Sequence, residues 1–260
     1  MVEIQRLAGA VVGRVLAGRS LDAELRAVWR RHARLTARER GAIQDLAYGA
    51  LRFLGRLEAL LEALLDKPLR DARLRALLLV ALYQLEHTRA APHAIVDHAV
   101  RTCEILGLTA AKGLANAVLR NFLRNRAATT ARAQHSETGR YSHPQWWIDK
   151  LRAQYPSHYA AILEADNLHP PLALRVNRRR ITPVGYLALL AQHGIAGEAC
   201  GESAVVLGSP LPAERIPGFA DGLVSVQDAA AQLAAPLLDL RDGMRVLDAC
   251  AAPGGKTAHA

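Results

Sequence analysis

The chain has 260 residues, of which 51% are hydrophobic, and this length suffices for one or two buried cores. Its formal net charge is +9. It has no basic-then-apolar leader and no run of 18 apolar residues, so the sequence predicts a cytoplasmic protein and excludes the secreted and membrane-spanning classes.

The cysteines and histidines do not have the spacing of a metal site. Three cysteines lie far apart, without the paired spacing of a zinc site or a disulfide framework, and we expect reduced thiols. His87, His93 and His98 are six and five residues apart, so they do not share one helical face as metal ligands. The sequence therefore predicts no metal.

Charge is distributed unevenly along the chain. Residues 1–140 contain 23 Lys and Arg against 13 Asp and Glu, whereas residues 141–260 contain 10 against 11. A net charge of +10 on the first part favours RNA or DNA as a partner. Genome composition is the alternative explanation, because 29 of the 33 basic residues are arginine.

Residues 1–127 carry apolar side chains every three or four positions, which predicts an all-α bundle with short connections. Thr36 and Glu39 have the capping-box spacing of a helix start. Pro92 is typical of a helix start and Gly107 of a helix end. Cys103 falls on the apolar face of the helix between them, and we interpret it as a core residue.

The remaining residues predict a chain of three further segments. Residues 128–140 lose the helical periodicity and are interpreted as a linker. Residues 141–222 predict a helix followed by a small α/β domain, with strands at 172–177 and 204–207 around a helix at 183–193. Residues 223–260 predict the start of a doubly wound, Rossmann-like α/β domain, with a helix at 227–240 and a first strand from residue 245.

The loop after that first predicted strand is the strongest motif in the chain. Asp248 ends an apolar run, and ligands of open α/β sheets bind at the carboxyl ends of the strands. Gly254 and Gly255 then allow a sharp turn into a helix whose amides face the ligand. Lys256 follows, and its side chain either stays in solvent, pairs with an acid or faces an anionic group of the ligand. The pattern predicts a nucleotide-like ligand, with a turn that binds nothing as the alternative.

A phosphate-binding P-loop is a second reading of the same glycines. Counting back from Gly255, the first glycine that a P-loop requires falls on Cys250. Pro253 in addition removes one backbone amide from the loop. The spacing therefore argues against an NTPase.

The residues of this loop resemble a known family. Segment 246–257, Val-Leu-Asp-Ala-Cys-Ala-Ala-Pro-Gly-Gly-Lys-Thr, resembles the first S-adenosylmethionine motif of the RNA cytosine-5 methyltransferases. Segments 174–177, 211–219 and 224–232 are similar to those that precede it in the same family. Segments 77–85 and 116–124 resemble the NusB-like helical domain of members that act on 16S ribosomal RNA.

The resemblance implies an rRNA (cytosine-C5-)-methyltransferase, monomeric, with S-adenosyl-L-methionine as cofactor and 16S rRNA as partner. It assigns the cofactor to Cys250, Ala251, Ala252, Pro253, Gly254, Gly255 and Lys256. It also implies covalent catalysis, in which a cysteine thiolate adds to cytosine C6 and later leaves. The two cysteines that do this in the family belong to later motifs that residues 1–260 do not contain, so no catalytic residue is assigned here. The chain is accordingly expected to be an inactive part of a longer enzyme, and the alternative is a non-catalytic NusB-like RNA-binding or transcription-regulatory module.

Two further groups are candidates for RNA contact. Arg178, Arg179 and Arg180 follow the strand at 172–177, where they either track phosphates or form a solvated basic turn. Trp146 and Trp147 lie near a helix start, which favours a domain interface over stacking on bases.

Overall fold

The computed structural model describes residues 1–259, and its contacts divide the chain into two compact units after Leu168. Residue 260, the last of the predicted third domain, lies outside the described residues. The two units are described separately.

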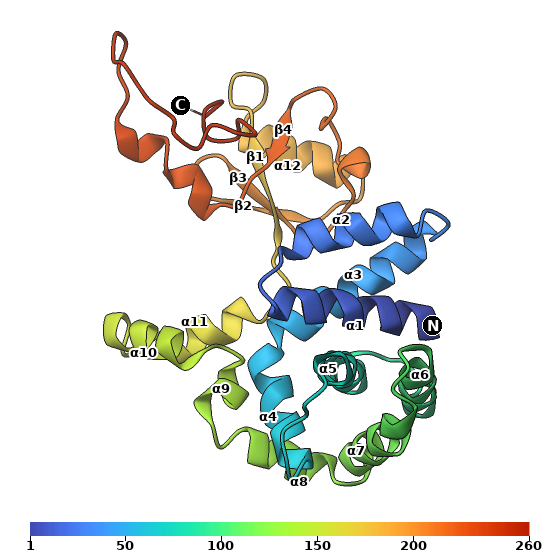
Figure 1. Cartoon of the computed structure of the whole chain (residues 1–260). Helices are drawn as coiled ribbons and strands as arrows, with labels where there is room; N and C mark the ends of the chain where they lie inside the picture. The colour runs from blue at the N-terminus through green and yellow to red at the C-terminus, as the bar shows by residue number, and fades with distance from the viewer. Residues whose placement is uncertain (260) are drawn as a thin grey trace. The chain divides into compact units, whose positions relative to one another are not determined.

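The first unit is helical throughout, and the bundle that the periodicity predicts for residues 1–127 is confirmed (Figure 1). Its helices are α1 (Val2–Leu16), α2 (Leu21–Arg31), α3 (Ala37–Arg52), α4 (Leu54–Leu64), α5 (Ala72–His87), α6 (Pro92–Ile105), α7 (Lys112–Arg124), α8 (Arg126–Ala133), α9 (Glu137–Tyr141), α10 (Gln145–Gln154) and α11 (Tyr159–Asp166), with a 3₁₀ turn, η1 (Thr109–Ala111).

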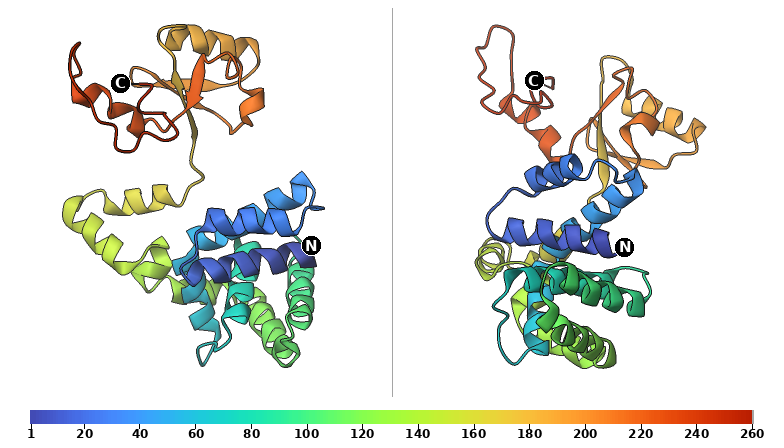
Figure 2. Two further views of the ribbon diagram at one scale, coloured as in Figure 1. Left: turned by 45° about the horizontal axis from the view of Figure 1, so that its top comes forward. Right: turned by 45° about the vertical axis from the view of Figure 1, so that its right-hand side comes forward.

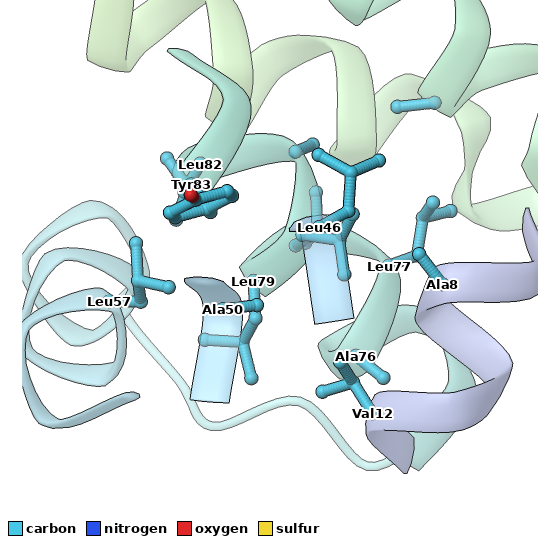
Figure 3. Packing of buried hydrophobic residues seen from close by; sticks show 14 of the residues in the cluster. Ala8, Val12, Leu46, Ala50, Leu57, Ala76, Leu77, Leu79, Leu82 and Tyr83 are labelled. Atoms are coloured by element: carbon cyan, nitrogen blue, oxygen red, sulfur yellow. The ribbon is translucent and has the colours of Figure 1, made fainter. Parts of the chain in front are cut away.

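Helix α5 is the centre of this bundle because it is apolar on nearly all sides. It contacts α1, α3, α4, α6 and α7, and eleven of its residues are buried. A helix that is hydrophobic all round is stable only when other elements surround it. Figure 3 shows side chains of α5, including Leu77 and Leu82, among Ala8 and Val12 of α1 and Leu57 of α4. Each buried leucine contributes roughly 1.5–3 kcal/mol.

The local helix signals act as the sequence predicts. The Glu39 amide donates to the Thr36 hydroxyl at 3.3 Å, and the Thr36 amide donates to the Glu39 carboxylate at 2.8 Å, which completes the capping box. Pro92 is the first residue of α6, and Gly107 takes a φ of 71° just beyond its end. Cys103 is fully buried, and burial raises the pKa of its thiol.

The prediction of a linker at 128–140 is wrong, because helices α8 and α9 occupy these residues. Thr129 and Ala133 are buried at i, i+4 spacing, and Tyr141 at the end of α9 is also buried. Both helices pack on α4. Their buried faces consist largely of small or polar residues. The helical spacing of the buried positions is therefore not visible as a pattern of hydrophobic residues.

Helices α10 and α11 form a smaller core with the end of α9. Ile148, Leu151 and Leu163 are buried there, and Trp147 packs against them, whereas Trp146 is 66% exposed. These helices group with the first unit by contact, and that unit ends at Leu168. The predicted domain limits stay a prediction.

The second unit contains an antiparallel sheet in the order β2-β3-β1-β4, with bounds β1 (Leu172–Val176), β2 (Gly197–Cys200), β3 (Ala204–Leu207) and β4 (Val224–Val226). Helix α12 (Pro183–Gln192) packs against β2 and β3. Leu174, Tyr186 and Val205 are fully buried in the core between them. The small α/β domain is therefore confirmed, but β2 and β4 were missed, since β2 is mostly exposed and β4 has only three residues.

The predictions for 227–247 are wrong in detail. In place of the helix at 227–240 there are two 3₁₀ turns, η3 (Ala230–Leu233) and η4 (Pro236–Leu238), because Pro236 has no amide hydrogen and clashes with a preceding helical turn. The strand expected from residue 245 is not formed, and no strand after β4 occurs within residues 1–259 (Figure 2). Leu247 is 88% exposed. A strand needs a hydrogen-bonded neighbour, and the described residues supply none.

We expect Gly49→Ala to destabilise the first unit by about 1–3 kcal/mol, because a Cβ at Gly49 would overlap the buried ring of Tyr83. Gly41→Ala is the matched control in the same helix. A Cβ at Gly41 meets no atom within 4 Å, so this variant is expected to gain about 0.5–1 kcal/mol from helix propensity. Urea unfolding followed by tryptophan fluorescence measures both, and equal effects of the two substitutions would contradict the α3–α5 packing.

Candidate functional site

The candidate site is the loop 248–257 together with the end of the sheet beside it. The Asp248 carboxylate accepts a hydrogen bond from the Cys250 amide at 2.9 Å and one from the Thr257 hydroxyl at 2.5 Å. The Thr257 hydroxyl, the Cys250 amide and the charge of Lys256 hold the pKa of Asp248 below its usual value. One ionised carboxylate thus joins both ends of the loop.

The predicted cofactor residues form the open part of this loop. Gly254 takes a φ of 102°, and a Cβ added at Gly254 or Gly255 would meet no atom within 4 Å. Gly254 and Gly255 are half-buried, while the other predicted residues are exposed: Cys250, Ala251, Ala252, Pro253 and Lys256. The loop backbone is therefore accessible to a ligand, as the small residues predict.

Arg175 connects the sheet to the loop. It lies on β1, and its Nη1 donates to the carbonyl oxygen of Gly255. Burial lowers the pKa of this guanidinium. Sequence reasoning did not single out Arg175; the available signal was an arginine inside an otherwise apolar strand.

A cleft of about 730 Å³ lies within the second unit, along β1 and β4. This volume is in the range of small-molecule and cofactor sites. Its polar lining comes from the following side chains: Arg175, Asn177, Arg178, Arg179, Ser203, Ser225, Thr257 and His259. Of the loop, Thr257 lines the cleft, but residues 250–256 do not. The structure thus brings the end of the loop and the predicted basic turn together, and leaves the rest of the cofactor motif outside the cleft.

The three arginines of that turn have different environments. Arg178 forms an ion pair with Glu202 at 2.8 Å, and Arg180 donates to the carbonyl oxygen of Asp221. Arg179 is exposed and lines the cleft. Nearby, burial and the charges of Arg175 and Arg178 lower the pKa of His259. The cleft is cationic through its arginines, which suits an anionic ligand.

Within residues 1–259 no group of three His, Cys, Asp or Glu side chains is arranged to hold a metal ion. None of the helices in that part of the chain is long and apolar enough to cross a membrane.

Two protein families match parts of the chain. The NusB family matches residues 3–124, which contain α1 to α7. The family described as Methyltr_RsmF/B-like, ferredoxin-like domain matches residues 143–214, from α10 through β3.

Relatives with curated names extend the match over nearly the whole chain. Ribosomal RNA small subunit methyltransferase B of Pseudomonas putida is 46% identical over 97% of this chain and 57% of its own length. The protein of the same name from Pseudomonas syringae pv. tomato is 48% identical over 85% of the chain and 50% of its own length. That of Serratia proteamaculans is 40% identical over 98% and 60%. The chain thus spans between half and three-fifths of these relatives.

A solved structure supports the fold. The crystal structure of PH0851 matches with a TM-score of 0.66 at 18% identity, over all of this chain and 60% of the other. At this identity the likeness shows the fold alone. The curated relatives and the two domain families show that the chain is a homologue of ribosomal RNA small subunit methyltransferase B, with a NusB-family domain followed by an RsmF/B-like ferredoxin-like domain.

Proposed function

We propose that the chain is part of a cytoplasmic, monomeric methyltransferase that transfers a methyl group from S-adenosylmethionine to C5 of one cytosine in 16S ribosomal RNA. The observation that carries the proposal is the 46% identity, over 97% of the chain, to a relative named as a small-subunit ribosomal RNA methyltransferase. The loop 248–257 supports the choice of cofactor, because its residues resemble a methyltransferase motif and its backbone is open.

The cofactor would be held by Cys250 to Lys256. Three observations fit a bulky ligand at this loop: small side chains, open space at Gly254 and Gly255, and an ionised Asp248 that joins the loop ends. When bound, S-adenosylmethionine supplies an electrophilic methyl group. Asp248 orients the loop through Thr257, and Arg175 fixes the carbonyl of Gly255.

RNA would approach through basic side chains. Arg179 is exposed at the cleft, and Arg178 carries a second guanidinium there. Phosphate groups are bound by such side chains with little regard to sequence, so the cleft supports contact with the backbone and leaves the choice of cytosine to other groups.

We assign no catalytic nucleophile among the three cysteines. Cys103 is buried in the bundle, Cys250 belongs to the cofactor loop, and Cys200 is exposed on β2. A nucleophilic cysteine needs a neighbouring proton acceptor or cation that favours its thiolate form. It also needs access to the cytosine ring that it attacks. Residues 1–260 by themselves are therefore proposed to bind RNA but to transfer no methyl group.

The test uses the 260-residue chain and a chimera that adds the part of the Pseudomonas putida relative that the chain does not match. With tritiated S-adenosylmethionine and 16S rRNA, we expect the chimera to label the RNA and the 260-residue chain to leave it unlabelled. Nuclease digestion followed by mass spectrometry should identify the modified nucleoside as 5-methylcytidine. Label on another base would contradict the cytosine assignment. Label transferred by the 260-residue chain alone would contradict its proposed inactivity.

Asp248→Ala in the chimera is expected to weaken S-adenosylmethionine binding about tenfold, because the loop loses both hydrogen bonds that join its ends. The depressed pKa also predicts a pH dependence. Binding is expected to be constant above the ordinary pKa of aspartate and to fall as the pH drops through the lowered value. Isothermal titration measures both effects. Asp239→Ala, at an exposed acid outside the loop, is the control, and equal effects of the two variants would contradict the role of Asp248.

A further inference from the structure

Helix α2 ends in a group of arginines that continues through the turn into α3. Arg30 and Arg31 lie in the last turn of α2, Arg34 lies in the turn that follows, and Arg38 lies in the first turn of α3. We call these four residues the α2–α3 arginine patch. All four are exposed.

The patch differs from its neighbouring arginines in having no partner. Arg26 pairs with Asp22, and Arg40 lies 5.9 Å from the centre of the Trp29 ring and donates to the Ala33 carbonyl at 3.3 Å. By contrast, the four patch guanidiniums form no ion pair and no side-chain hydrogen bond within residues 1–259. Their guanidinium groups therefore have no side-chain partner among the described residues.

Folding explains only part of this arrangement. Cations in the last turn of a helix are favoured by the helix dipole, which accounts for Arg30 and Arg31. The same dipole disfavours a cation in the first turn, where Arg38 lies, and like charges on adjacent turns repel. Since Arg38 opposes the local electrostatics of the fold, an external anion is the better reason for its presence.

The surroundings of the patch indicate the class of partner. No large apolar side chain is exposed in α2 or in the turn that follows it, and the first exposed one in α3 is Tyr48, ten residues beyond Arg38. The patch residues therefore have no exposed apolar neighbour in sequence of the kind that forms the centre of a protein interface. Interfaces with nucleic acids are polar and strongly positive, and guanidinium groups bind phosphate through two parallel hydrogen bonds.

We propose that the α2–α3 arginine patch binds backbone phosphates of the RNA substrate. The inference deepens the proposed function, on which it rests for the identity of the polyanion as RNA. The surface is separate in sequence from the cleft along β1 and β4. It gives the NusB-family domain a direct part in holding the substrate.

The experiment compares three versions of the 260-residue chain by filter binding to a 16S rRNA transcript at KCl concentrations from about 50 to 300 mM. The test variant carries R30Q, R31Q, R34Q and R38Q. The matched control carries R89Q, R120Q, R124Q and R132Q, four exposed arginines on other parts of the first unit. Both variants remove four charges, so a simple effect of net charge is the same in each.

We expect the test variant to bind about 10- to 100-fold more weakly near 100 mM KCl. The slope of log affinity against log salt should fall in magnitude by about 3, since each lost phosphate contact to single-stranded RNA removes about 0.7. The control should keep the parent slope. Replacing the four patch arginines by lysine should restore most of the slope, because the charge remains.

Three results would overturn the proposal in distinguishable ways. If the parent binds RNA and the test variant keeps the parent slope of log affinity against log salt, the patch does not bind phosphate, and the proposed function is unaffected. An equal loss in the control would show that binding is spread over the whole basic surface. If the parent chain does not bind the transcript, the RNA part of the proposed function fails together with the patch. Should the fourfold variant not fold, Arg38→Gln alone is measured, with an expected slope change of about 0.7.

Discussion

Gly139→Ala is expected to destabilise the first unit by about 3 kcal/mol. Gly139 lies in α9, and a Cβ at this position would overlap the carbonyl oxygen of Ala133 in α8 and approach the Ala59 Cβ of α4 to 2.8 Å. Because one of these atoms belongs to the backbone, relief requires a shift of the helix and not only a change of rotamer. Urea unfolding followed by tryptophan fluorescence isolates the effect, since Trp29, Trp146 and Trp147 all lie in the first unit.

Gly113→Ala is the matched control for Gly139→Ala. Gly113 lies in α7, and a Cβ there meets no atom within 4 Å, so the substitution is expected to be neutral or to stabilise by up to about 1 kcal/mol. The comparison tests whether helices α8 and α9 pack on α4. If residues 128–140 were a solvated linker, Gly139→Ala would be as harmless as Gly113→Ala.

Glu86→Ala is expected to destabilise the first unit by roughly 3 kcal/mol. Arg56 of α4 donates to both carboxylate oxygens of Glu86 on α5, at 2.8 and 2.9 Å, and their side chains are 18% and 5% exposed. The hydrogen bonds from Arg56 to Glu86 raise the pKa of Arg56. Removing Glu86 therefore leaves a charged, largely buried guanidinium without its partner. The same fluorescence-detected urea unfolding measures the loss of stability.

A double substitution separates the cost of losing the ion pair from the cost of leaving a buried charge unpaired. Arg56→Met with Glu86→Leu is expected to cost less than Glu86→Ala alone, because no uncompensated charge remains. Asp97→Asn is the control for an exposed pair. It breaks the Arg101–Asp97 contact, whose side chains are both 61% exposed, and should change stability by less than about 0.5 kcal/mol. Equal costs for Glu86→Ala and Asp97→Asn would contradict the buried pairing.

Chemistry that depends on a few adjacent residues was predictable from the chain. The capping box at Thr36 and Glu39 and the helix start at Pro92 were correct, because each is set by hydrogen bonds and backbone angles within one turn. The helical stripes of residues 1–127 were correct because burial on one side of a helix imposes its own period. The loop 248–257, for which the sequence predicts a cofactor, stands out for a similar reason, because its acid and its two glycines lie within eight residues of each other.

The errors occur where distant residues decide the local conformation. Helices α8 and α9 have small or polar buried faces, and it is packing on α4 that determines which side is covered. Strand β2 is mostly exposed and is defined by its pairing with β3. Residues 245–248 have the composition of a strand, yet composition does not supply the hydrogen-bonded neighbour that a strand needs.

The sequence by itself thus determined the helical bundle and the small α/β domain, because each of these follows from residues that are neighbours along the chain or along one helix. The cofactor motif at 248–257 stays a prediction from neighbouring residues. Only the tertiary structure placed Arg175 against Gly255, paired Arg56 with Glu86 and left the α2–α3 arginine patch without side-chain partners among residues 1–259. These relations join residues that are up to 80 positions apart, or depend on which charges lack a neighbour in space. They follow from the three-dimensional packing of the elements, which no local pattern specifies.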